Sequence, residues 1–133
     1  MKGYNDNIER LTEQNEDFRR VLYTGAHLQL VLMTIQPGEE IGSEVHDDRD
    51  QFFRFEKGTG VVDIDGVANK VEDGSGVIVP AGARHNVRNT GSAPLKLYSI
   101  YGPPEHIDGV VHHSKADAEK RHADEEWDGK TTE

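Results

Sequence analysis

The amino-acid sequence predicts an all-β domain, a sandwich or barrel built from short strands. Between Phe18 and Tyr101, runs of apolar and β-branched residues alternate with turn residues at short spacing. Fourteen glycines among 133 residues fit a chain with many tight turns. No long helical pattern separates the apolar runs, which argues against a parallel sheet with crossover helices. We therefore expect a single domain of seven or eight strands with a buried hydrophobic core.

The expected strands follow one another along this zone, and each ends at residues that favour a turn. Leu28–Ile35 is almost wholly apolar, so both faces of this strand are expected to be buried. Val61–Ile64 runs into Asp65-Gly66, a dipeptide typical of a tight hairpin. The expected strands are Arg20–Tyr23, Leu28–Ile35, Gln51–Phe55, Val61–Ile64, Asn69–Val71, Gly76–Val79, His85–Arg88 and Leu95–Tyr101.

The two ends of the chain are polar and are expected to lie outside the barrel. The N-terminal arm is predicted to be short or helical and to dock on the body through Ile8, Leu11 and Phe18. The acidic C-terminal segment is predicted to be helical from Lys115 to Glu126. The predicted division is an arm at 1–17, a barrel at 18–104 and a tail at 105–133.

Histidines are frequent in the C-terminal segment. His112 and His113 are adjacent, so their side chains point apart on any regular element and do not form a metal site together. We predict that these two residues, together with His106 and His122, lie on the surface.

Composition excludes several functional classes. A formal net charge of -10 disfavours binding to nucleic acid or to anionic membranes. The absence of cysteine excludes disulfides, thiolate metal sites and cysteine nucleophiles. No apolar run is long enough for a membrane span, and no export signal is visible at the N-terminus, so we expect a cytoplasmic protein.

The first of two spaced motifs begins at Gly38. Five residues separate Gly38 from Glu44, and His46 follows Glu44 after one residue. Four residues then lead to Gln51, and six more lead to Gly58. Side chains two apart on a strand share a face, so Glu44 and His46 are expected to point the same way.

The second motif begins at Gly74. Five residues separate it from Pro80, and Pro80-Ala81-Gly82 is followed after two residues by His85. Asn89 closes the motif after three more residues. A proline in this turn restricts the backbone that aims His85.

These two motifs, in this order, resemble the two signature motifs of the cupin superfamily. The first signature carries His-x-His and a glutamate, where this chain has Glu44 at the first histidine position and Gln51 at the glutamate position. The second signature matches without departure. Fifteen residues separate Gly58 from Gly74, as in compact microbial cupins. The resemblance implies a cupin jelly-roll β-barrel and a homodimer.

The resemblance also implies a bound divalent metal ion, held by Glu44, His46, Gln51 and His85. This set carries one negative charge, as does the usual cupin set of three histidines and a glutamate. The amide oxygen makes the site harder, which favours Fe(II) or Mn(II) over copper, while Zn or Ni can also occupy it. A rival set uses Asp48 or Asp50 in place of Glu44. A cupin that has lost its metal is the other alternative.

A substrate pocket is expected beside the metal. Phe53 and Phe55 share the face of Gln51 and offer an apolar wall, unless they serve only as core. Tyr98 and Tyr101 on the last strand could offer a hydroxyl, with packing as the alternative role. The predicted function is a metal-dependent enzyme on a small organic molecule, with dioxygenase chemistry favoured. The alternatives are isomerase chemistry and a non-catalytic module that binds a small molecule or a sugar. No general base apart from the ligand candidates can be assigned. This weakens the isomerase hypothesis, because such a mechanism needs a base.

Overall fold

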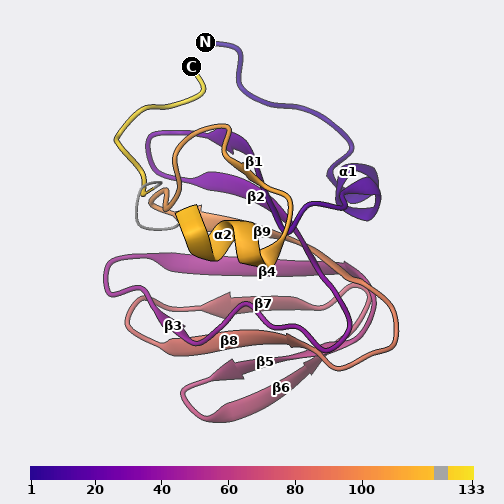
Figure 1. Ribbon diagram of the computed structural model, residues 1–133. Helices are drawn as coiled ribbons and strands as arrows, with labels where there is room; N and C mark the ends of the chain where they lie inside the picture. The colour runs from indigo at the N-terminus through magenta and orange to yellow at the C-terminus, as the bar shows by residue number, and fades with distance from the viewer. Residues whose placement is uncertain (122–125) are drawn as a thin grey trace.

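The computed structural model describes residues 1–121 and 126–133. This part of the chain forms ten strands and two short helices (Figure 1). The strands are β1 (Arg19–Thr24), β2 (Gln29–Ile35), β3 (Glu44–Val45), β4 (Asp50–Lys57), β5 (Gly60–Ile64), β6 (Val67–Val71), β7 (Gly76–Val79), β8 (Arg84–Asn89), β9 (Leu95–Gly102) and β10 (Val111–His112). The helices are α1 (Ile8–Gln14) and α2 (Lys115–Arg121).

Two antiparallel sheets enclose the core, which confirms the predicted all-β jelly-roll class. The larger sheet has the order β10-β1-β2-β9-β4-β7, and the smaller has the order β3-β8-β5-β6 (Figure 1). Alternate residues of each strand point inward, as the pleat requires. The inward side chains form one apolar cluster whose fully buried members include Val31, Met33, Ile35, Phe53, Phe55, Val62, Val87, Leu95 and Leu97.

All eight predicted strands are present, with ends that differ by one or two residues from the predicted ones. The Asp65-Gly66 hairpin is confirmed, because both residues have positive φ, 47° and 83°, as a tight turn between antiparallel strands favours. Leu28 is 48% exposed, so the burial of this strand begins at Gln29. The two-residue strands β3 and β10 were not predicted, since a pair of residues is too short to show a period.

The N-terminal arm carries α1 and docks on the body as expected. The side chain of Asn7 caps the helix by accepting a hydrogen bond of 2.9 Å from the backbone N–H of Arg10. Ile8 and Leu11 are half-buried, and Phe18 is buried in the core. No helix of residues 1–121 and 126–133 has the length and apolar character needed to cross a membrane.

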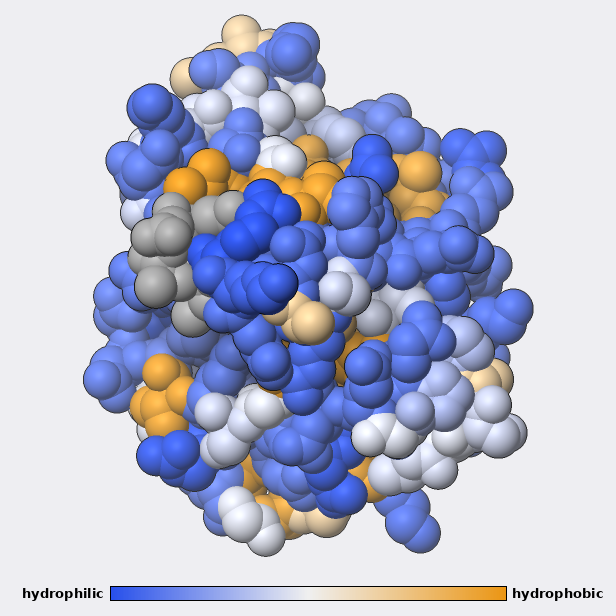
Figure 2. Space-filling model, in the orientation of Figure 1, coloured by the Kyte–Doolittle hydropathy of each residue, from blue (hydrophilic) through white to orange (hydrophobic). Residues whose placement is uncertain are grey.

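The C-terminal segment returns to the body. β10 pairs with β1, in the register Arg19↔His112, so this segment adds a strand to the larger sheet. Helix α2 covers part of the predicted helix at 115–126, and residues 122–125 lie outside the described residues. Figure 2 shows that the face of the molecule carrying this helix is predominantly hydrophilic.

Candidate metal centre

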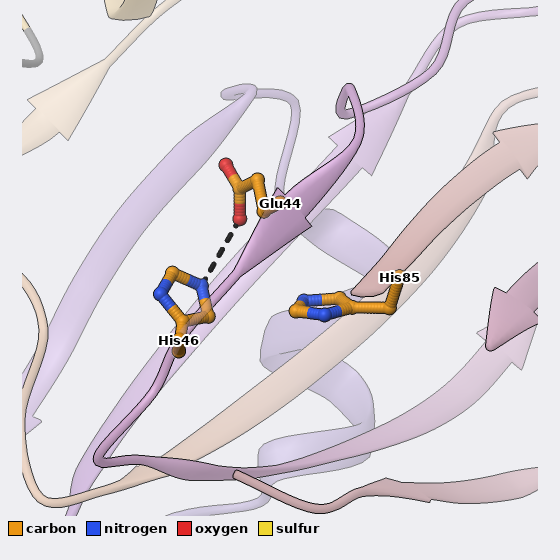
Figure 3. Close-up of side chains that lie close together, drawn as sticks. All are labelled: Glu44, His46 and His85. Atoms are coloured by element: carbon orange, nitrogen blue, oxygen red, sulfur yellow. Dashed lines mark hydrogen bonds and ion pairs between the residues drawn. The ribbon is translucent and has the colours of Figure 1, made fainter. Parts of the chain in front are cut away.

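Strand pairing in the smaller sheet brings two predicted ligands together. Glu44 lies directly opposite His85 where β3 pairs with β8. His46 follows two residues after Glu44 and therefore shares its side of the chain. Figure 3 shows the side chains of Glu44, His46 and His85 converging on one region from two neighbouring segments. The spacing of both sequence motifs is thus explained by the register of two strands.

The three side chains lie at distances suited to a shared ion. One potential ligand atom from each of Glu44, His46 and His85 lies within 4.8 Å of the other two. The Oε2 atom of Glu44 is 3.1 Å from the Nε2 atom of His46 (Figure 3). Bonds of about 2.0–2.2 Å from nitrogen and oxygen to one metal ion place ligand atoms about 3.0–3.5 Å apart, so the Glu44–His46 distance already fits and the upper limit of 4.8 Å is too long. Small side-chain movements would therefore allow one ion to bind all three.

Polar contacts at Nδ1 hold both imidazole rings with Nε2 toward the cluster. The Nδ1 atom of His85 lies 3.1 Å from the carbonyl oxygen of Ala83, so it carries the proton and donates it there. The Nδ1 atom of His46 lies 3.6 Å from Oε2 of Glu105, an ion-pair contact that is longer than a hydrogen bond, while its Nε2 atom donates to Oε2 of Glu44 at 3.1 Å. Metal-binding histidines are commonly held in this way, with one nitrogen on a carbonyl or carboxylate and the other on the metal.

Glu105 was not identified from the sequence. It lies three residues beyond the end of β9, and its Oε2 atom is also 2.9 Å from Nε of Arg49. Its side chain is only 11% exposed, so this carboxylate forms a supporting layer behind His46. A single glutamate in a polar tail carries no spacing signal that could have revealed this role.

Gln51 enters the same interior from the facing sheet. It is 2% exposed, and its Nε2 atom donates a hydrogen bond of 2.9 Å to Oγ of Ser99. Its Oε1 atom is buried and has no hydrogen-bond partner among the described residues. An unpaired buried acceptor is costly, so this oxygen fits a site that holds a cation or a cation-bound water. Its direct ligation of a metal stays a prediction.

Burial and mutual charge shift the pKa values of all three residues. Burial raises the pKa of Glu44, but the hydrogen bond to His46 and the nearby charges of His46 and Arg19 lower it overall. The hydrogen bond to Glu44 raises the pKa of His46, with a further contribution from Glu105. Burial lowers the pKa of His85. The cluster therefore combines an ionised carboxylate with a neutral imidazole, the charge state that a divalent cation needs.

The comparisons with known proteins decide the family. The family model for the cupin domain matches residues 31–101. The chain belongs to the cupin family. This cupin is 51% identical over 118 residues to the uncharacterised protein YrkC of Bacillus subtilis (strain 168), across 84% of the chain and 63% of YrkC. The chain thus spans less than two thirds of YrkC.

Two further relatives resemble this cupin over most of its length. A protein of Acanthamoeba polyphaga mimivirus is 38% identical over 110 residues, across 79% of this chain and 68% of its own. The crystal structure of BH2720 from Bacillus halodurans superposes with a TM-score of 0.88 at 49% identity, and covers 90% of this chain and 95% of that one. The last match extends well beyond the motif region.

The rival ligands of this cupin lie elsewhere. Asp48 is 72% exposed and pairs with Nη1 of Arg49 at 2.5 Å. Asp50 accepts a hydrogen bond of 2.9 Å from the backbone N–H of Ala81, which ties β4 to the turn before His85. Neither aspartate belongs to the carboxylate–histidine cluster found among the described residues, so the structure favours Glu44.

Of the four residues considered for the pocket, Phe53, Phe55 and Tyr101 are inside the barrel. The ring of Phe53 lies 6.3 Å from that of His85, and Phe55 packs against Phe53 at the same distance, one step deeper in the core. Tyr98 lies on the outer face of β9, where its ring contacts that of Phe52. The prediction for Tyr98 is therefore corrected: Tyr101, which faces inward opposite Gln51, contacts the His46 ring instead, at 6.0 Å.

Two histidines of the C-terminal segment are also corrected. His106 and His112 are 3% and 1% exposed, so the predicted surface positions are wrong for both. His106 packs edge-on against Tyr101, with ring centroids 5.3 Å apart. His112 is buried because β10 pairs with β1, and its Nδ1 atom lies 3.1 Å from Nη1 of Arg19. His113 is exposed as predicted, and His122 lies outside the described residues.

Proposed function

We propose that this cupin is a metal-dependent enzyme that acts on a small organic molecule, with dioxygenase chemistry favoured. The observation that carries the proposal is the convergence of two histidines and one carboxylate, with both Nδ1 atoms engaged elsewhere. Such a two-histidine, one-carboxylate set suits non-haem Fe(II). A bound Fe(II) or Mn(II) would supply Lewis-acid and redox chemistry at Glu44, His46 and His85. Gln51 would complete the set through its unpaired Oε1 atom.

The residues around the cluster determine how much water reaches it and which proton donors and bases lie beside it. Phe53 and Tyr101 are 1% and 2% exposed, so they exclude water from the inner side. Burial raises the pKa of Tyr101 far above its usual range, so its hydroxyl keeps its proton and acts as a hydrogen-bond donor. Glu105 is already paired with His46 and Arg49 and is therefore a poor general base. This arrangement supports oxygen chemistry over an isomerase mechanism, which needs a free base.

Metal analysis tests the ligand set. Protein produced with Fe, Mn, Zn or Ni should contain about one equivalent of metal in the wild type, and Glu44→Ala, His46→Ala and His85→Ala should lose it. Asp48→Ala, the rival position, is the matched control and should keep its metal. Retention of metal in all three ligand variants would show that the assignment is wrong.

Oxygen consumption tests the reaction class. With Fe(II)-loaded protein, a phenol or a diketone from a substrate panel should consume an equimolar amount of O2, because a dioxygenase places both oxygen atoms in the product. Labelled ¹⁸O2 should then give a product that carries two labelled atoms. Binding of panel compounds without O2 uptake would instead support a non-catalytic cupin. The homodimer and the cytoplasmic location stay predictions.

A further inference from the structure

A buried arginine stands next to the metal cluster, and no carboxylate of residues 1–121 and 126–133 forms an ion pair with it. Arg19 on β1 is 4% exposed, and its guanidinium lies 5.3 Å from the centroid of the Phe18 ring. Its Nη1 atom contacts Nδ1 of His112, which is an uncharged acceptor atom. Its Nε atom is buried and has no hydrogen-bond partner among the described residues. A buried cation with an unused donor is costly, unless a ligand completes it.

A cavity of about 220 Å³ joins this arginine to the cluster. Arg19 and Glu44 line it from the body, and Lys115 lines it from helix α2. Ala118 and Glu119 also line it from helix α2, and Phe18 and Ile41 form the apolar part of the wall. The volume lies below the range of about 300–1,000 Å³ typical of drug-sized ligands, so the occupant is a small molecule.

The charges around the cavity favour an anion. Lys115 has a side chain only 25% exposed, and it pairs with Glu119 across 3.9 Å on one side of α2. Glu119 is 68% exposed, so water screens its charge, and such an exposed pair is weak. Glu44 is committed to the metal in the proposed function. The lining has two cationic and two anionic side chains. With Glu44 committed to the metal and Glu119 screened by water, Arg19 and Lys115 are the charges left to attract an anion.

We propose that Arg19 and Lys115 form a carboxylate-binding subsite beside the metal centre, so that the substrate is a small organic acid. This inference rests on the proposed function and names its substrate class. The planar guanidinium presents paired donors that match the two oxygens of a carboxylate. The acid group would bind toward Arg19 and Lys115, and the short carbon chain would lie against Phe18 and Ile41 near Glu44.

Binding of propionate, compared with propionamide of the same size, tests the subsite. Chemical-shift titration of ¹⁵N-labelled protein should show that propionate binds at Arg19 and that propionamide binds at least tenfold more weakly. Arg19→Met should raise the propionate Kd about tenfold and Lys115→Met about threefold, without a change for propionamide. Arg20→Met is the matched control, because Arg20 is the next residue of β1 and is exposed. It should leave the Kd unchanged.

The titration is carried out both on EDTA-treated and on Mn(II)-loaded protein, so that binding to the metal itself is separated from binding to the subsite. An unchanged propionate Kd in both Arg19→Met and Lys115→Met overturns the proposal, and if Arg19→Met does not fold, Lys115→Met against Arg20→Met decides. Tighter binding of inorganic phosphate than of propionate at Arg19 also overturns it, in favour of a phosphate ester. Failure of the metal assignment has a separate signature, which is wild-type protein that takes up no Mn(II).

Discussion

Replacement of Glu105 by glutamine would show how much the layer behind the ligands contributes to metal binding. The substitution keeps the size of the side chain and removes its negative charge. Glu105 Oε2 lies 3.6 Å from Nδ1 of His46, which is beyond the usual hydrogen-bond distance of about 2.7–3.2 Å. Its direct effect on the imidazole should thus lie at the lower end of the 10–100-fold range measured for such supporting residues.

A second effect adds to the first. Glu105 also neutralises Arg49, whose Nε atom is 2.9 Å away, and in Glu105→Gln this guanidinium would repel a bound cation. Together the two effects predict a Kd for Mn(II) that is raised roughly tenfold to thirtyfold, or about 1.4–2 kcal/mol. Competition with a chromogenic chelator at constant pH and ionic strength measures this Kd directly.

Asp48→Asn is the matched control for that measurement. Asp48 contacts the same arginine at 2.5 Å, yet it is 72% exposed and, among the described residues, forms no ion pair with His46. Its removal should change the Kd less than twofold, since exposed pairs contribute little. An unchanged Kd in folded Glu105→Gln, or an equal loss in Asp48→Asn, would refute the role of Glu105.

Three further predictions concern other parts of the fold. Gly60→Ala should lower the free energy of unfolding by about 1–3 kcal/mol in urea titrations, because its Cβ atom would lie 2.6 Å from the carbonyl oxygen of Arg88; wild-type stability would contradict this. The affinity for Mn(II) should keep rising as the pH increases past 6.5, because Glu44 raises the pKa of His46 and the metal must displace that proton. A plateau already reached below pH 6.5 would disprove it. Gln51→Glu should strengthen Mn(II) binding at least tenfold by placing a carboxylate at the unpaired acceptor, whereas Gln51→Leu should weaken it, both measured by chelator competition.

The sequence was most informative where the backbone conformation restricts the residue type. The Asp65-Gly66 hairpin and the turn before His85 could be located because glycine and proline have specific backbone preferences. Glu44 and His46 could be grouped because a strand repeats every two residues. These local rules explain why the barrel and the grouping of Glu44, His46 and His85 could be predicted.

The missed features depend on contacts between distant segments. β9 is apolar on both faces, so its period does not reveal which face is inside. Tyr98 was therefore predicted to face the pocket, whereas Tyr101 is the tyrosine that points inward. His112 is buried only because β10 pairs with β1, more than 90 residues earlier in the chain. Glu105 reaches the site through the same return of the C-terminal segment, whereas Arg19 reaches it from β1, and no local pattern encodes either position.

The backbone of Glu105 is itself tied to the far C-terminal residues. The N–H of Trp127 donates to its carbonyl oxygen at 3.0 Å, and that of Thr132 donates to the carbonyl oxygen of Thr24, at the end of β1, at 2.9 Å. Backbone hydrogen bonds therefore join the segment from Trp127 to Thr132 both to Glu105 and to the end of β1. In the proposed function, local opening of this segment would weaken the support that Glu105 gives to His46, and with it metal retention, while the barrel stayed intact.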